Sequence, residues 1–320
     1  MAWPWFNPRR RTFVWLTLGM AGCVAAFSLV YWFAVQTITG RQLADAALRG
    51  ALITQPRAAS AVEATLDVVT VTALIAAAGA IAVVALIRMR RTSGLVAVGV
   101  LLTANFSGQL LKSYILPRPD LGLAESAPAT LNSLPSGHTT AAFSIGVAAL
   151  FVVPVLLRWA TAIVGIAFSS TVAIATMSAG WHRVEDTLAS FFLVTFWALA
   201  AGGVMLLVQP GFMPAARRAA GKRRTRPWLV LASLGLSLLA VLIVAVLVSD
   251  HGVRDSSIGR FAAFLAGCLL IVGTAAATTA VVVRAVSRVS DPGTTVTGSG
   301  PDTDPAPVSS SFPAPGGSQG

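Results

Sequence analysis

Long apolar segments, separated by short polar connections, dominate this sequence. They cover roughly residues 13–35, 65–87, 94–111, 139–157, 160–180, 187–208, 228–249 and 261–283. A transmembrane helix needs about 20 predominantly apolar residues, and a segment in lipid must satisfy its own backbone hydrogen bonds, as a helix does. Only 11% of the residues are charged, against about 25% in soluble domains. The sequence therefore predicts an all-α fold, a polytopic transmembrane helical bundle.

Lysines and arginines concentrate in alternate connections, and Lys222–Arg226 is their densest cluster. The positive-inside rule then places residues 1–12, the basic loop 209–227 and the tail 284–320 in the cytoplasm, and we expect a multi-pass protein of the cell membrane. The net charge of +11 favours contact with anionic membrane lipids over a nucleic-acid partner. The tail is rich in Pro, Gly, Ser and Thr, so we expect it to be disordered.

Three polar segments emerge on the extracytoplasmic face of this predicted topology. The first carries Lys112 and Arg118, the second is Pro135-Ser136-Gly137-His138, and the third contains His182, Arg183 and Asp186. No other predicted outer connection collects such a mixture of histidine, cationic and acidic residues. The remaining histidine, His251, has no partner at metal-ligand spacing and is interpreted as a solvated loop residue.

The second segment has the composition of an anion-binding helix start. Pro135 is pre-organised for the beginning of a helix, which would put Ser136 and Gly137 in the first turn. Free backbone N–H groups and the helix dipole would attract an anion there, and Gly137 would let it approach closely. His138 would then lie beside the anion as a general acid. The alternative is a capped helix start with an incidental histidine.

The third segment pairs a histidine with a carboxylate. His182 and Asp186 are four residues apart, so they share a face of any helix that begins near His182. A carboxylate bonded to one imidazole nitrogen fixes the tautomer and leaves the other nitrogen free to attack. The alternative is an ordinary ion pair at a helix end.

The first segment supplies cations. Lys112 and Arg118 can neutralise a phosphate, and arginine can bind two of its oxygens at once. Phosphoryl transfer depends mainly on positioning and charge stabilisation. Taken alone, Lys112 also fits a side chain that extends to the membrane interface.

Together the three segments resemble the signature of the type 2 phosphatidic acid phosphatase superfamily, which reads K-x6-R-P, then P-S-G-H, then S-R-x5-H-x3-D. The second element matches in full, and His182 and Asp186 match the end of the third. The resemblance implies a six-helix phosphatase core at residues 13–208. Residues 228–283 would add two extra C-terminal transmembrane helices.

The sequence departs from this signature at two places. Five residues, not six, separate Lys112 from Arg118, which rotates a helical position by about 100°, unless the bend at Leu116 and Pro117 adjusts the register. The S-R pair falls on Ala175 and Thr176, so one phosphate-binding arginine is missing. Our hypothesis is that Arg183 replaces it.

The resemblance implies a mechanism without a metal or another cofactor. His182 would attack phosphorus and form a phosphohistidine, Asp186 would orient it, and His138 would protonate the leaving oxygen and later activate water. The phosphate would be held by Lys112, Arg118, Ser136 and the Gly137 amide. The substrate would be an amphiphile, either a lipid or a polyprenyl phosphate or diphosphate.

Three alternatives remain open at this point. A phosphoryl-group transferase of the same superfamily would use another acceptor in place of water. A lipid transporter or flippase would place its charges along a translocation path, and a catalytically weak relative would act as a scaffold. Phosphate release and product analysis with a second acceptor separate these possibilities. The oligomeric state and the role of the last two helices are not predicted.

Overall fold

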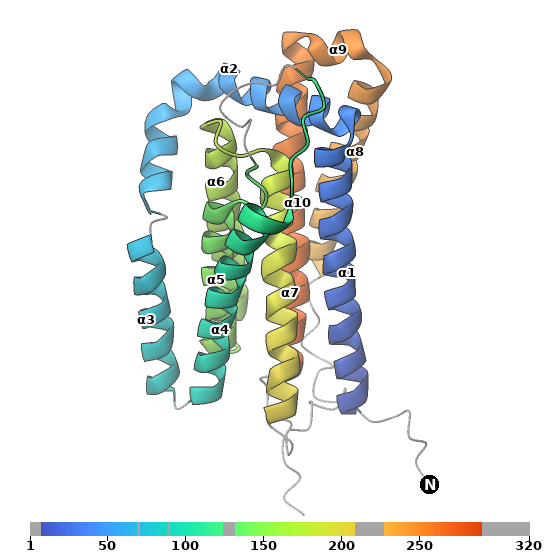
Figure 1. The fold of residues 1–320 in the computed structure, drawn as a ribbon. Helices are drawn as coiled ribbons and strands as arrows, with labels where there is room; N and C mark the ends of the chain where they lie inside the picture. The colour runs from blue at the N-terminus through green and yellow to red at the C-terminus, as the bar shows by residue number, and fades with distance from the viewer. Residues whose placement is uncertain (1–7, 69–70, 89, 124–131, 209–226, 290–320) are drawn as a thin grey trace, which may run out of the picture.

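The computed structural model describes residues 8–68, 71–88, 90–123, 132–208 and 227–289, and all regular secondary structure within these ranges is helical (Figure 1). The helices are α1 (Pro8–Gln36), α2 (Ile38–Val68), α3 (Val71–Ile87), α4 (Arg91–Leu110), the π-helix η2 (Leu111–Ile115), α5 (Gly137–Val152), α6 (Arg158–Ser178), α7 (Val184–Val208), α8 (Pro227–Ser249), α9 (His251–Asp255) and α10 (Ser257–Val289). The predicted helical bundle is therefore confirmed.

Six helices in the described ranges are long and apolar enough to cross a membrane: α1, α4 with η2, α6, α7, α8 and α10. The predicted segments 65–87 and 139–157 correspond to shorter apolar helices, α3 and α5. Helix α5 ends at Val152, five residues before the predicted end, because Pro154 cannot continue a helix and disfavours helical backbone at the residue before it.

The connection between the first two predicted spans contains a long helix, α2, which the search for apolar runs does not find. Figure 1 shows α2 across the end of the bundle opposite the N-terminus, at the same end as α9. Leu43, Ala47 and Ala51 recur every fourth residue and are buried, so α2 has one inward face. A Cβ on Gly50 would lie 2.0 Å from the Arg260 carbonyl oxygen. Helix α2 is therefore closely packed on α10.

Helix α10 is part of the centre of the bundle, where it packs against α2, α6, α7 and α8. A Cβ on Gly267 would lie 2.7 Å from Cγ2 of Val184, the first residue of α7. The second of the two C-terminal helices therefore supports the third polar segment. It extends to Val289, past the predicted end at residue 283, so the first residues of the expected disordered tail are helical. The rest of the tail and most of the basic loop lie outside the described residues.

The helix ends alternate between two ends of the bundle. The start of α1, the connection between α3 and α4, and the end of α7 lie at one end, and α2 and α9 lie at the other (Figure 1). The first group contains predicted cytoplasmic segments, and the second contains predicted outer ones. The arrangement fits the predicted topology, and the side of the membrane that each end faces stays a prediction.

Candidate active site

Ser136 is the N-cap of α5, and Gly137 is its first helical residue. The Ser136 hydroxyl accepts a hydrogen bond from the Thr139 amide at 3.3 Å and is buried. The prediction that Ser136 lies in the first helical turn is wrong by one residue, because serine is strongly preferred as the cap itself. Gly137 is exposed, and a Cβ there would meet no atom within 4 Å. The start of α5 therefore faces open space.

His182 follows a tight turn at the end of α6. Gly180 adopts a φ of 77°, a left-handed conformation that glycine accepts readily at a helix C-terminus. The amides of Trp181 and His182 then donate to the Thr176 carbonyl at 3.0 and 3.3 Å. Thr176, which stands where the signature has an arginine, is buried and helps to form the turn.

Asp186 binds His182 and the start of α7 with one carboxylate oxygen. Its Oδ2 atom lies 3.2 Å from His182 Nδ1 and accepts a hydrogen bond from the Arg183 amide at 2.9 Å, as an acidic side chain does in the first turn of a capped helix. The Ser133 hydroxyl donates to the same oxygen at 2.5 Å. All of these side chains are buried. Ser133 was not predicted as a site residue, since no local sequence pattern links it to Asp186.

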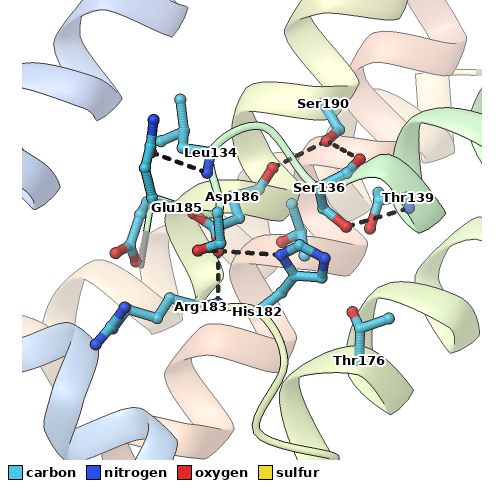
Figure 2. A network of polar contacts seen from close by, with 12 residues as sticks. Leu134, Ser136, Thr139, Thr176, His182, Arg183, Glu185, Asp186 and Ser190 are labelled. Carbon is cyan, nitrogen blue, oxygen red and sulfur yellow. Dashed lines mark hydrogen bonds and ion pairs between the residues drawn. The ribbon is translucent and has the colours of Figure 1, made fainter. Parts of the chain in front are cut away.

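Further hydrogen bonds join the second and third segments (Figure 2). The Ser136 amide donates to the Asp186 carbonyl at 3.0 Å. The Ser190 hydroxyl lies 2.9 Å from the carbonyl oxygens of both Ser136 and Asp186. The beginnings of α5 and α7 are therefore fixed to one another through their backbones.

The structure places the two predicted site histidines, His138 and His182, close to each other. The ring centroids of His138 and His182 are 6.1 Å apart, and the Trp181 ring lies 5.6 Å from that of His138. His138 is half-buried and precedes the apolar segment that begins at Thr139. Burial lowers the pKa of His138, and the charges of His182 and Lys112 lower it further. The separation allows both rings to contact one phosphoryl group.

Lys112 lies in the π-helix η2, close enough to His138 for its charge to lower the pKa of that imidazole. The Leu116 amide donates to the Leu111 carbonyl at 2.9 Å, a bond across five residues that widens the turn. The helix ends at Ile115 and Leu116 is extended, so Arg118 lies beyond the helix that carries Lys112. π-turns of this kind are frequent at functional sites.

The two arginines of the predicted site lie close to Glu185. Arg118 Nη1 is 3.9 Å from Glu185 Oε1, and both side chains are almost fully buried. The Arg183 side chain is also buried, and Figure 2 shows it extending away from the His182 imidazole. Arg183 would need another rotamer to reach a phosphate on His182. Its role as the replacement arginine stays a prediction.

The described residues contain no group of three His, Cys, Asp or Glu side chains placed to hold a metal ion.

One protein-family model matches part of the chain. No curated protein and no solved structure matches the chain significantly. The family model of the PAP2 superfamily matches residues 93–210, which include every predicted site residue from Lys112 to Asp186. The resemblance predicted from the three segments is confirmed, and it supports a phosphatase-like activity on phosphate esters. Residues 93–210 of this protein therefore match the PAP2 superfamily, the superfamily whose signature the three polar segments resemble.

Proposed function

We propose that this protein is a membrane phosphatase that hydrolyses a lipid or polyprenyl phosphate or diphosphate monoester at the extracytoplasmic face. The observation that carries the proposal is the His182–Asp186 contact of 3.2 Å, with a second imidazole 6.1 Å away between ring centroids. An imidazole held at Nδ1 by a carboxylate keeps Nε2 as its nucleophilic atom.

In the first step, His182 Nε2 attacks phosphorus while the bond from phosphorus to the substrate oxygen breaks. Protonated His138 gives its proton to that oxygen, so the alcohol or the shorter phosphate leaves in neutralised form. Asp186 stabilises the positive charge that develops on the His182 ring. The product of this step is a phosphohistidine.

In the second step, water attacks the phosphohistidine and the bond between nitrogen and phosphorus breaks. His138, now neutral, accepts a proton from the water, which returns it to its starting state. Inorganic phosphate leaves, and His182 is restored. One imidazole thus acts as acid and then as base.

The phosphate is held by charge and by backbone amides. Lys112 lies close enough to influence His138, and Gly137 presents the exposed first turn of α5. The start of a helix attracts anions through its free N–H groups. In this proposal Arg118, Ser136 and Arg183 complete the phosphate site after side-chain rearrangement on binding.

An amphiphilic substrate is favoured by the surroundings of the histidines. Trp181 lies against His138 and is 48% exposed. Tryptophan side chains favour the interface between lipid and water. A head group at that depth would place its phosphate beside the two imidazoles, and its chains would remain among the membrane lipids.

The test measures phosphate release by purified full-length protein from phosphatidate, phosphatidylglycerophosphate, polyprenyl phosphate and polyprenyl diphosphate. We expect hydrolysis of at least one of them, and we expect His182→Ala to lower it by about a thousandfold or more. His251→Ala is the matched control, because His251 is exposed at the start of α9. Undiminished hydrolysis by His182→Ala would falsify the assignment of the nucleophile.

Two further readouts address the intermediate and the membrane side. Radioactive phosphate from the substrate should be found on the unmodified protein after rapid quenching and be absent from His182→Ala, which lacks the proposed nucleophile. In sealed right-side-out vesicles, a membrane-impermeant short-chain substrate should be hydrolysed without permeabilisation. Hydrolysis only after permeabilisation contradicts the predicted face.

A phosphoryl-group transferase is the second candidate function. It is favoured by Thr176, which stands where the signature has a phosphate-binding arginine. Product analysis with an added alcohol acceptor separates the two functions. A transferase forms a new phosphate ester in preference to inorganic phosphate.

A further inference from the structure

A polar cavity of about 340 Å³ lies where α2 and α9 meet α10, apart from the histidines. Four arginines and two aspartates line it: Arg41, Arg49, Arg254, Arg260, Asp45 and Asp255. Figure 1 shows α2 and α9 at the same end of the bundle. The lining residues therefore come from parts of the sequence that are about two hundred residues apart.

Contacts with neighbouring helices and loops hold the guanidinium groups in place. Arg41 is 4% exposed; it donates from Nε to the Val35 carbonyl at 2.8 Å and from Nη2 to the Pro119 carbonyl. Arg254 donates to the Gln42 amide oxygen at 3.0 Å. These contacts order long side chains before any ligand arrives, which lowers the entropic cost of binding.

Two arginines of the lining pair with its two aspartates. Asp45 lies 2.6 Å from Arg49, and Asp255 lies 3.3 Å from Arg254. The described lining residues comprise four arginines and two aspartates, so arginine predominates among their charged side chains. An anion is therefore the favoured ligand.

We propose that this cavity binds a phosphate-bearing anionic group, at a site separate from that of the phosphate to be cleaved. The planar guanidinium matches two oxygens of a phosphate, and several arginines on different helices can bind one tetrahedral group together. A cavity of about 340 Å³ falls within the usual range of small-ligand sites. It therefore accommodates a phosphorylated head group. The source is either a membrane lipid or a soluble phosphate compound.

All charged residues of the lining lie outside residues 93–210, the segment that matches the superfamily. The cavity is thus a property of α2 and of the C-terminal helices. Its ligand binding does not depend on the proposed reaction. It nevertheless adjoins the active site, because Arg41 contacts the carbonyl of Pro119, the residue after Arg118.

The test uses full-length protein in nanodiscs and two probes. One arm titrates inorganic pyrophosphate into nanodiscs of phosphatidylcholine, and the other replaces part of the phosphatidylcholine with phosphatidylglycerol. The readout is the rise in melting temperature. Hydrogen exchange of residues 41–49 and 251–260 in the unmodified protein gives a second measurement that needs no variant.

Arg260→Gln and Arg49→Gln remove one guanidinium each from the partly exposed side of the lining. We expect each variant to weaken binding of the effective probe by about tenfold, and Arg260→Lys to bind with intermediate strength. Arg91→Gln is the matched control, because Arg91 is an exposed arginine at the opposite end of the bundle.

Stabilisation by pyrophosphate that weakens in both glutamine variants supports a soluble phosphate ligand. The same pattern with phosphatidylglycerol alone supports a lipid head group. Equal stabilisation of both variants and the unmodified protein overturns the proposal. So does the absence of added protection at residues 41–49 and 251–260 with either probe. Melting temperature and hydrogen exchange do not depend on phosphate release. A negative result for this cavity would therefore not contradict the proposed hydrolysis.

Discussion

Asp186 places one carboxylate oxygen, Oδ2, 3.2 Å from Nδ1 of His182, and the same oxygen accepts hydrogen bonds from the Ser133 hydroxyl and the Arg183 amide. The histidine is therefore held by a carboxylate that is itself fixed from two other directions. An oriented imidazole presents one tautomer, and the tautomer decides which nitrogen is nucleophilic.

Asp186→Asn should lower kcat by roughly 10²–10⁴-fold with little change in KM. The amide keeps the shape of the side chain, but it no longer stabilises a positive imidazole or enforces its tautomer. Steady-state kinetics on the best lipid phosphate measure the effect. Asp250→Asn is the control, because Asp250 also accepts a bond from a helix N-terminus, that of Val253 in α9. Near-normal kcat in Asp186→Asn would count against the role of Asp186.

Ser133→Ala should lower kcat by about tenfold or more and leave KM nearly unchanged. The variant removes a buried donor to a carboxylate, a bond of about 1.5–3 kcal/mol. Ser249→Ala is the matched control, since its hydroxyl donates to the Ala245 carbonyl on an exposed helix end. A change in KM alone would show that Ser133 acts on binding and does not position Asp186.

Lys112→Met should move the high-pH limb of kcat/KM to higher pH. Burial lowers the pKa of His138, and the charges of His182 and Lys112 lower it further. The first step requires protonated His138, so it weakens as pH rises through that lowered pKa. Removing the Lys112 charge raises the pKa, and the loss of activity then begins at higher pH.

Lys112→Arg keeps the positive charge and should leave the midpoint of that limb unchanged. The maximal rate falls in Lys112→Met for a separate reason, the loss of a phosphate contact, so the midpoint is the diagnostic quantity. The same midpoint of the high-pH limb in Lys112→Met and Lys112→Arg would contradict this prediction.

Gly267→Ala should destabilise the protein by about 1–3 kcal/mol and reduce kcat. Its new Cβ would lie 2.7 Å from Cγ2 of Val184, and Val184 begins the helix that carries Asp186. Gly235→Ala is the control, because a Cβ there meets nothing within 4 Å, and we expect no loss of stability. Thermal melting and steady-state kinetics test both variants. Equal melting temperatures would contradict the close packing of α10 on α7.

Long apolar runs were sufficient to predict the bundle, and the spacing of four residues predicted the pairing of His182 with Asp186. The superfamily and the approach of His138 to His182 were predicted from the ordered motifs and the predicted topology. Ser133 could not be predicted, since its bond to Asp186 spans 53 residues. The turn at Lys112 was not predicted either. A π-turn depends on the packing at the end of α4 and has no local composition signal.

Helix α2 was not predicted, because its sequence has no continuous apolar run. The repeat of Leu43, Ala47 and Ala51 was visible in the sequence, and it would have predicted an amphipathic helix. For Ser136, two rules competed: proline favours the first helical position, and serine favours the cap. The cap prevailed, which moved the helix start to Gly137.

The backbone bond that joins Ser136 and Asp186, with the Ser190 hydroxyl bridging their carbonyls, limits how far α5 and α7 can separate. Spreading α5 from α7 would break these bonds, so we expect the two imidazoles to keep their spacing when a substrate binds. Lys112 and Arg118 lie on a segment outside this linkage. If the proposed head group binds here, we expect it to meet a fixed pair of rings, with Lys112 as the cation that adjusts to its size.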